Sequence, residues 1–395
     1  MRSHHAASGN EAQAWIAARL ADLDLRLIGS DEPRVRPWST VQRIETDGGP
    51  VWFKANGPGT TYEPALVEAL AELAPGHVLD PLATDVEVGW ALVPDGGRIL
   101  RSFDDDVVLS HWLRILPAYA ELQRATSDHV RDLVGRGVPD ARPQRLPERF
   151  SALLDDTDVL LVDRPGGLSR EQLSRLRDLE PTYAEWCARL DGAGIPPSIE
   201  HGDLHDGNVF VRDGGYAIFD WGDACVGHPF ASLLVTLSSI AHRYDLPAGA
   251  AELAGLRDAY LEPWADGGRR AELAETVRLA TRVTRSPARC RGTGRCQRCR
   301  QTGVANTARP FRAGFSSCSS RTCSERVLPR DAGTTSSSVV EDALHDGPGP
   351  ARDLPVVVDE CSALAGCVAE DAGHGRERLR VPRERVGPPA GDQHD

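Results

Sequence analysis

The sequence of 395 residues predicts an α+β fold with two lobes, a small antiparallel-sheet lobe with one inserted helix and a mainly helical lobe. Short apolar runs separated by turn residues fill the first lobe, and amphipathic helical spacing dominates the second. The amino-acid composition then changes abruptly near residue 286. We therefore expect three parts, 1–95, 96–285 and 286–395. The last part is a Cys-, Arg- and Gly-rich tail.

The first lobe has alternating strand and turn signals. A short amphipathic helix is expected over 11–23, and a second helix over Glu63–Leu73. Asp47-Gly48-Gly49 is a strong hairpin signal, because glycine readily adopts the positive φ of a tight turn. The expected strands are 25–28, 41–46, 51–55, 77–84 and 87–93.

The second lobe is predicted to be helical with one short β insertion. The insertion covers 199–212 and 216–221 and is dense in His, Asp, Gly and Asn. A Pro- and Arg-rich stretch at 137–149 is expected to separate the first two helices. The expected helices are 107–126, 169–190, 230–241, 248–264 and 269–285.

Composition narrows the class of protein. Hydrophobic content of 41% and charged content of 26% are ordinary for a globular protein, and no apolar run is long enough to cross a membrane. The polar N-terminus lacks a signal segment, so we expect a cytoplasmic location without a membrane partner. The net charge of −13 argues against a nucleic-acid partner, and residues 1–285 alone carry 29 basic and 44 acidic side chains.

Lys54 is the only lysine among 45 lysine and arginine residues. It ends the apolar run Val51-Trp52-Phe53, so it is predicted to lie on a strand. Arginine offers a planar fork, whereas lysine offers a compact point charge suited to a nucleotide phosphate. Chance survival of one lysine in a GC-rich gene is the alternative explanation.

The β insertion carries the residues that phosphoryl transfer requires. It reads His201-Gly202-Asp203-Leu204-His205-Asp206-Gly207-Asn208, and Asp220-Trp221-Gly222 follows after a hairpin. One carboxylate can orient an attacking hydroxyl, while an amide oxygen and a second carboxylate can hold magnesium. The spacing therefore predicts Asp203 as the catalytic residue and Asn208 and Asp220 as the metal ligands.

These paired motifs resemble those of the aminoglycoside phosphotransferase and choline-kinase-like family of small-molecule kinases. The resemblance covers roughly residues 20–285 and implies a protein-kinase-like fold, ATP as phosphate donor and Mg²⁺ as metal. It also implies that Lys54, on the third expected strand, holds the α- and β-phosphates. Glu63 on the next helix is then the partner of Lys54, with Glu68 as the competing candidate.

The resemblance implies further nucleotide contacts. The segment Leu92–Asp95, including Val93 and Asp95, becomes the hinge whose backbone binds adenine, and Ser39 and Thr40 come near the phosphates. The Gly-rich loop of protein kinases is missing here, and Asp-Trp-Gly stands in place of Asp-Phe-Gly. Both departures favour small-molecule kinases over protein kinases.

The remaining residues of the loop are given no chemistry. His201 is expected to pin the catalytic loop, and His205 and Asp206 are expected to be solvated or to face the substrate. Where many relatives carry a structural Asp after the metal motif, this chain has Ala231-Ser232-Leu233, which weakens the assignment to a subfamily.

Seven of the nine cysteines lie in the tail, and their spacing permits a zinc site. The first three are Cys290, Cys296 and Cys299, but the single CxxC has no matching partner. The surroundings lack apolar periodicity, so we expect a disordered or frameshift-derived tail. Residues 290–300 can be encoded by GC-rich codons whose neighbouring frame resembles the last helix of the kinase family.

The sequence as a whole predicts an ATP-dependent kinase that phosphorylates a hydroxyl of a small molecule. The acidic balance fits an aminoglycoside-like or other amine-bearing acceptor, although the motifs do not identify it. Two alternatives remain open. One is a catalytically silent nucleotide-binding regulatory protein, and the other is a zinc- or nucleic-acid-binding role for the tail.

Overall fold

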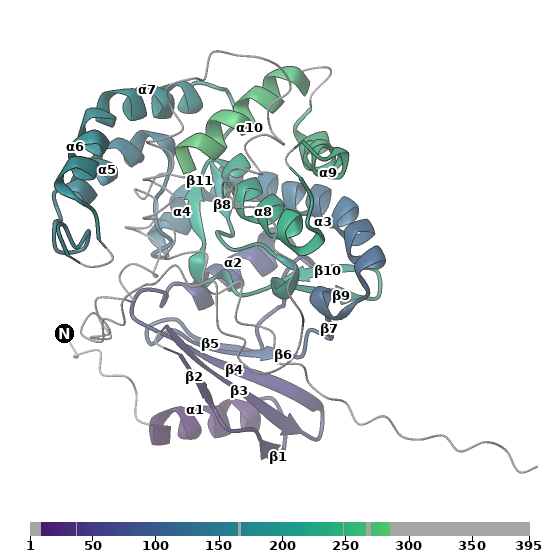
Figure 1. The fold of residues 1–395 in the computed structure, drawn as a ribbon. Helices are drawn as coiled ribbons and strands as arrows, with labels where there is room; N and C mark the ends of the chain where they lie inside the picture. Colours follow the sequence, from purple (N-terminus) through teal and green to yellow (C-terminus); the bar gives the residue numbers. More distant parts are fainter. Residues whose placement is uncertain (1–8, 37, 165–166, 248, 266–269, 285–395) are drawn as a thin grey trace, which may run out of the picture.

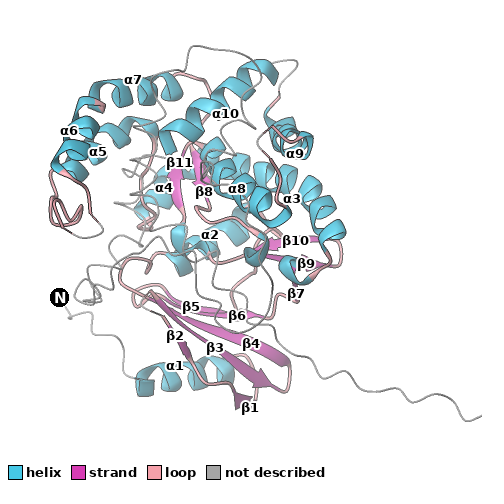
Figure 2. Ribbon diagram, viewed as in Figure 1, coloured by secondary structure: helices cyan, strands magenta, loops and turns pink. Residues whose placement is uncertain are grey.

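The computed structural model describes residues 9–36, 38–164, 167–247, 249–265 and 270–284 (Figure 1). An antiparallel sheet with one helix on either side forms the sheet lobe, α1 to β6, and a larger, mainly helical body forms the helical lobe, β7 to α10 (Figure 2). The expectations for residues 286–395, including a zinc site, disorder and a frameshift, lie outside the described residues.

The sheet lobe is built on a six-stranded sheet of order β1-β3-β4-β6-β5, with β2 pairing with the outer side of β3. All of its paired strands are antiparallel. Its elements are α1 (Gly9–Asp22), β1 (Leu27–Ser30), β2 (Arg34–Val35), β3 (Ser39–Thr46), β4 (Gly49–Asn56), α2 (Glu63–Leu73), β5 (Ala83–Asp85) and β6 (Trp90–Pro94).

The sequence predicted the centre of this sheet better than its edges. The β3–β4 hairpin turns at the predicted glycines, with Thr46 paired to Gly49, and α2 has the predicted bounds. The strand expected over 77–84 is wrong for most of its length, because only 83–85 joins the sheet. Val78 instead bridges Ile218 of the helical lobe, and Pro81 lacks the N–H that a ladder needs.

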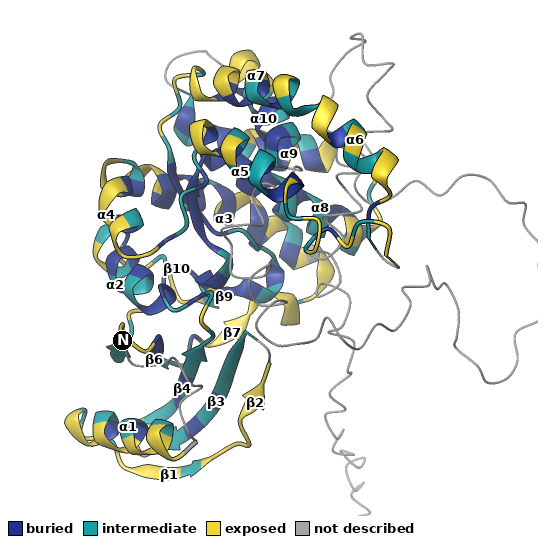
Figure 3. Ribbon diagram, turned by 90° about the vertical axis from the view of Figure 1, so that its left-hand side faces the viewer, coloured by how far each residue is buried: buried dark blue, intermediate teal, exposed yellow. Residues whose placement is uncertain are grey.

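Side-chain alternation along β4 divides the two faces of the sheet. Val51 and Phe53 are buried against α1, where Ile16 and Leu20 complete a small apolar core. Lys54 and Trp52 alternate with them and therefore point to the opposite face. The short strands β1 and β2 remain almost entirely exposed at one edge (Figure 3). The unexpected strand β2 makes the Lys54 strand the fourth along the chain.

The helix α2 packs on the helical lobe and belongs to its apolar core. Leu66 and Leu70 are fully buried there together with residues of α3. The hydroxyl of Tyr62, just before α2, lies 2.8 Å from the carbonyl oxygen of Gly222 and 3.0 Å from that of Ala224. These contacts fix the start of α2 against the segment that follows Asp220.

The helical lobe surrounds a core of large aromatic side chains, including Trp112, Tyr119, Phe150 and Phe230. Its helices are α3 (Asp105–Thr126), α4 (Val130–Gly135), α5 (Leu146–Leu154), α6 (Arg170–Asp178), α7 (Glu180–Asp191), α8 (Ser232–Tyr244), α9 (Ala251–Leu261) and α10 (Arg270–Thr284). Its short strands are β7 (Arg98–Ile99), β8 (Ser198–Glu200), β9 (Val209–Arg212), β10 (Gly215–Ile218) and β11 (Cys225–Gly227).

Prolines account for two differences from the expected helices. The helix expected over 169–190 is two helices, and α7 begins at Glu180-Pro181 where proline occupies the first turn. The stretch 137–149 was expected to be a linker, but α5 begins inside it at Leu146-Pro147. Proline is well tolerated in the first turn of a helix because the N–H there has no intrahelical partner.

The β insertion of the helical lobe pairs with the chain that leaves the sheet lobe. The β9–β10 hairpin matches the prediction, and β7 adds to it as a third strand. The strands β8 and β11 form a separate antiparallel pair. None of the described helices is long and apolar enough to cross a membrane.

The contacts of Tyr62 lead to a stability prediction. Replacing Tyr62 by Phe leaves two buried carbonyl oxygens without this donor, so the free energy of unfolding should fall by about 1–2 kcal/mol. Urea denaturation measures the change. Ser110→Ala removes an exposed hydroxyl that contacts only Val107 in its own turn, and it should change stability by less than about 0.5 kcal/mol. Equal effects of the two variants on stability would contradict the stabilising role of the Tyr62 hydroxyl.

Two buried histidines lead to a pH prediction. Burial lowers the pKa of His201 to about 4 and that of His228 to about 3. The unfolded chain binds these protons near pH 6.5, whereas the folded chain does not. The stabilisation is therefore fully present above about pH 6.5 and is lost as the pH falls toward the folded-state values.

The contribution of His228 can be isolated with one variant. Near pH 5, His228→Gln should reduce the slope of unfolding free energy against pH by about 1.4 kcal/mol per pH unit, which corresponds to one proton. Urea titrations at several pH values measure it. Ser110→Ala provides the control, because it removes no titratable group and should leave the slope unchanged. A slope that His228→Gln does not alter would show that this histidine is charged in the folded protein.

Candidate active site

The ammonium of Lys54 lies between two carboxylates on the inner face of the sheet. Its Nζ is 2.8 Å and 2.7 Å from the two oxygens of Glu63 and 2.6 Å from Oδ1 of Asp220. Burial by itself would lower the pKa of Lys54, but the charges and hydrogen bonds of Asp220 and Glu63 outweigh it and raise the pKa above its usual value. Lys54 is therefore charged at neutral pH.

The structure distinguishes the two glutamates of α2. Glu63 lies in the first turn of the helix with its side chain 6% exposed and contacts Lys54. Glu68, one turn later, accepts a hydrogen bond from the hydroxyl of Thr84 instead. The partner of Lys54 is thus Glu63 and not Glu68.

Asp220 holds an uncommon backbone conformation. Its φ of 63° and ψ of 59° lie in the left-handed region, which non-glycine residues seldom occupy. The side chain remains 53% exposed although Lys54 contacts one of its oxygens. Such a residue needs support from its surroundings, and the fixed strands and turns on either side of Asp220 supply it.

His201 connects the catalytic loop to the strand before Asp220. Its Nδ1 accepts a hydrogen bond from the backbone N–H of Asp203 at 3.2 Å, so Nε2 carries the proton and donates to the carbonyl of Phe219 at 2.9 Å. Burial lowers the pKa of His201, and the neutral ring is the form that this geometry requires. His201 thus pins the loop, as the sequence suggested.

Gly202 permits a close approach between two segments of the site. Its φ is +82°, and a Cβ at this position would lie 2.2 Å from the carbonyl oxygen of Asp223. Any larger residue would push the catalytic loop away from the segment after Asp220. The glycine of the His-Gly-Asp motif is therefore required by packing as well as by backbone conformation.

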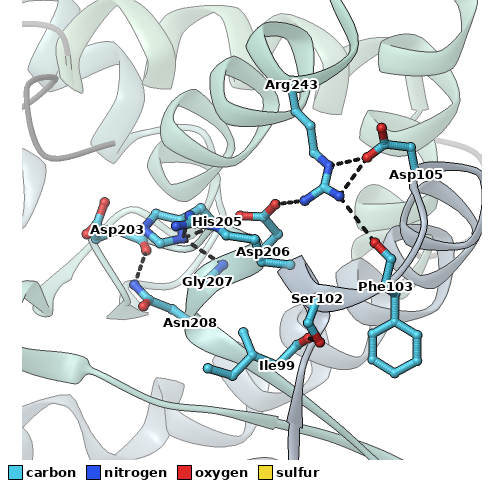
Figure 4. Close-up of polar contacts among 11 residues, drawn as sticks. Ile99, Ser102, Phe103, Asp105, Asp203, His205, Asp206, Gly207, Asn208 and Arg243 are labelled. Carbon is cyan, nitrogen blue, oxygen red and sulfur yellow. Dashed lines mark hydrogen bonds and ion pairs between the residues drawn. The ribbon is translucent and has the colours of Figure 1, made fainter. Parts of the chain in front are cut away.

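Asp203 and Asn208 lie at opposite ends of the same turn. The Asn208 side chain donates from Nδ2 to the carbonyl of Asp203 at 2.9 Å (Figure 4). Its backbone carbonyl accepts from the Phe219 N–H at 3.1 Å. Asn208 is buried, whereas the Asp203 side chain is 20% exposed. The turn therefore offers one amide oxygen and one accessible carboxylate.

The donor set fits a hard divalent cation for which substrate and water supply most of the ligands. The Asn208 amide oxygen and the Asp220 carboxylate are both oxygen donors, the type that Mg²⁺ prefers. No cluster of three or more His, Cys, Asp or Glu side chains suited to a metal occurs among the described residues. Sites with few protein ligands are usual where phosphates complete the coordination of Mg²⁺.

Strand register separates the two residues expected near the phosphates. Ser39 pairs with Asn56 and Thr40 with Ala55. Since side chains alternate, Ser39 shares the face of Lys54, while Thr40 shares the face of Gln42 and Ile44 that lies against α1. The register thus brings only Ser39 to the inner face.

The expected hinge follows β6 directly. Val93 pairs with Trp52 of the Lys54 strand, and Asp95 accepts hydrogen bonds from the Trp52 indole at 3.0 Å and from Gly97 N–H at 2.8 Å. The side chain of Asp95 thus closes the turn. Phe210 stacks on Phe219 with ring centroids 4.2 Å apart, an apolar pair that no local sequence pattern indicated.

Asp206 corrects one expectation from the sequence. It was expected to be solvated or to face the substrate, but its side chain is only 9% exposed and forms ion pairs with Arg101 and Arg243. These arginines are 105 and 37 residues away along the chain, so no local pattern could have revealed them.

Comparison with known proteins gives one family match. The family model described as "Phosphotransferase enzyme family" matches residues 41–273, more than half of the chain, from β3 into α10. No curated protein matches the chain at significant similarity.

Several solved structures are similar to the chain. A choline/ethanolamine kinase family protein from Mesorhizobium loti is 16% identical with a TM-score of 0.49, covering 90% of this chain and 98% of that one. An ethanolamine kinase from Plasmodium vivax is 13% identical with a TM-score of 0.46, covering 70% and 78%. An aminoglycoside-3'-phosphotransferase of type VIII is 19% identical with a TM-score of 0.41, covering 69% and 98%.

The family match confirms the resemblance inferred from the His-Gly-Asp and Asp-Trp-Gly motifs. It spans Lys54, Glu63, Asp203, Asn208 and Asp220. The chain belongs to the phosphotransferase enzyme family and has its two-lobed, protein-kinase-like α+β fold.

Proposed function

We propose that this protein transfers the γ-phosphate of ATP to a hydroxyl group of a small molecule. The observation that carries the proposal is the contact of Lys54 with both Glu63 and Asp220, beside the turn that bears Asp203 and Asn208. We assign residues 1–95 to nucleotide binding and residues 96–285 to catalysis and acceptor binding. ATP as donor accords with the cytoplasmic location expected from the sequence.

Lys54 is proposed to hold the α- and β-phosphates of ATP. The Lys54 side chain is 19% exposed, so it can reach a ligand while Glu63 keeps it in place. Phosphoryl transfer asks for little covalent chemistry, and positioning of charge supplies most of the rate acceleration. Ser39 on the same face is a further candidate for the phosphates. Thr40, also expected near the phosphates, has less support, because its register directs it to the other face.

Asp203 is proposed to orient the acceptor hydroxyl and to accept its proton. The carboxylate is accessible, while the Asp203 backbone is held by His201 and by the Asn208 amide. A base that is held in this way is already close to the geometry that proton transfer requires. Because these contacts hold the loop while the carboxylate stays accessible, they favour this role for Asp203 over that of an ordinary loop aspartate.

Asn208 and Asp220 are proposed to hold Mg²⁺. When bound there, the ion would neutralise charge on the phosphates. Asp220 already contacts Lys54, so the two groups that would meet the phosphates from the protein side lie within 2.6 Å of each other. This proximity of one cationic and one metal-ligating group supports a shared phosphate site.

The hinge and the acceptor complete the proposal. The backbone of Leu92–Asp95, with Val93 and Asp95, is proposed to bind adenine, and the Phe210–Phe219 stack lies on the helical-lobe side. An amine-bearing acceptor such as an aminoglycoside-like molecule is favoured by the net charge of −15 over residues 1–285.

Removal of the proposed base provides the direct test. Asp203→Ala should lower kcat by about 10²–10⁴-fold, because the acceptor hydroxyl loses its base while nucleotide binding is retained. ATP consumption, screened over amine- and hydroxyl-bearing small molecules, identifies an acceptor and then measures the variant. Asp213→Ala, in the exposed β9–β10 turn, should retain wild-type turnover. Nucleotide binding without Mg²⁺-dependent turnover across the panel would favour a silent nucleotide-binding protein instead.

Exchange of the lone lysine tests whether charge alone is sufficient. Lys54→Arg keeps the charge, but the larger planar group cannot occupy the short distances to Glu63 and Asp220. We expect kcat/KM for ATP to fall at least about 100-fold, which equals about 2.7 kcal/mol. The reciprocal change Arg164→Lys, at an exposed ion pair, should have no effect on turnover. Full activity of Lys54→Arg would sink the proposed role of the ammonium.

A further inference from the structure

The Asp206 carboxylate lies between two guanidinium groups immediately behind the catalytic turn. Oδ1 is 2.8 Å from Nε of Arg101. Oδ2 forms a close ion pair with Nη1 of Arg243 (Figure 4). Arg101 belongs to the linker that leaves β7, and Arg243 lies in the last turn of α8. We call Arg101, Asp206 and Arg243 the carboxylate clamp.

Arg243 is itself fixed by contacts on its other side. Its Nε and Nη2 lie 2.9 Å and 2.6 Å from Oδ1 of Asp105 at the start of α3, and Nη2 also contacts the carbonyl of Phe103 (Figure 4). The planar guanidinium thus bonds to Asp206, Asp105 and the Phe103 carbonyl in directions that its rigid fork fixes. The clamp therefore joins the catalytic turn to both α8 and α3.

Arg101 also sets the orientation of His205. Its Nη2 lies 3.1 Å from His205 Nδ1, and the Gly207 N–H donates to the same nitrogen at 2.9 Å. Since Nδ1 accepts from these donors, the proton of the neutral ring is on Nε2. That nitrogen faces Oδ2 of Asp203 at 3.7 Å. The imidazole thus presents a donor toward the proposed base.

Buried ion pairs contribute little net stability compared with apolar packing of similar volume, because both charges lose their hydration. Asp206 is three residues after Asp203 and two before Asn208, in the turn Asp206–Asn208 itself. The position of Asp206 therefore favours a role in fixing the geometry of the turn over a role in stabilising the fold. A fixed Asp206 fixes the turn from which His205 and Asn208 project.

We propose that Asp206 is a positioning residue, which the carboxylate clamp holds so that Asn208 and His205 are directed toward the metal and Asp203. This inference rests on the proposed function for the roles of Asp203 and Asn208. Asp206 itself touches neither substrate nor metal in this proposal. Its effect passes through the backbone of the turn and through the imidazole of His205.

The test compares Asp206→Asn with Asp140→Asn in the full-length protein. Asp140 is also a part-buried aspartate, 18% exposed, held by two bonds from Arg142, but it lies outside the catalytic turn. Mn²⁺ serves as the probe because it prefers the same oxygen ligands as Mg²⁺. Free Mn²⁺ is measured by electron paramagnetic resonance with AMP-PNP present, and kcat and KM are measured with an active acceptor.

Asp206→Asn should weaken Mn²⁺ binding at least 3-fold and lower kcat at least 10-fold, with KM for the acceptor changed less than 2-fold. Asp140→Asn should leave all three quantities within 2-fold of wild type, although it too loses an ion pair. This split between metal affinity, kcat and KM is not expected of a purely structural residue. Wild-type values in Asp206→Asn, or equal losses in both variants, would overturn the inference.

Two provisions keep the outcome decisive. If Asp206→Asn does not fold, Arg101→Gln replaces it, since the Arg101 side chain is 45% exposed and makes the same connection to Asp206 and His205. The same thresholds then apply. If no acceptor is phosphorylated by the wild type, the proposed function fails, but the Mn²⁺ affinities alone still support or overturn the positioning role.

Discussion

The ammonium of Lys54 joins parts of the chain that are far apart in sequence. Glu63 is 9 residues away and Asp220 is 166 residues away, yet both carboxylates lie within 2.8 Å of Nζ. Burial of a lone ammonium would be costly, so the contact persists only while both acids are in place. Tyr62 reinforces it from beside α2 by bonding to Gly222 and Ala224, just after Asp220. The geometry of the site thus depends on α2 and the Asp220 segment keeping their relative positions.

A neutral imidazole stabilises the second half of the site. His201 accepts from Asp203 N–H with one nitrogen and donates to the Phe219 carbonyl with the other. A protonated ring would present two donors, and its Nδ1–H would then oppose the Asp203 N–H. Burial keeps the pKa of His201 low enough to prevent this near neutral pH. The same burial therefore serves both the fold and the catalytic turn, because one ring spans the loop and the strand before Asp220.

Local patterns predicted the parts of the structure that depend on neighbouring residues. The glycine hairpin, the bounds of α2 and the spacing of Asp203, Asn208 and Asp220 are all readable from short segments. The clamp around Asp206 could not be predicted from local sequence, because its arginines come from a linker and from the end of a helix. The strand expected over 77–84 failed for a similar reason. Its residues were apolar enough for a strand, but their partner was Ile218 of the other lobe.

The use of one lysine beside many arginines follows from two different electrostatic tasks. Arg243 must hold Asp206, Asp105 and the Phe103 carbonyl together, and a rigid planar fork fixes all three directions. In the proposed role, Lys54 has to bind its carboxylates and remain able to meet a phosphate, which suits a compact charge on a flexible stem. An arginine there would favour fixed bidentate pairing with Glu63 or Asp220. Arginine is therefore suited to the clamp around Asp206, and lysine to the partly exposed position that we propose for phosphate binding.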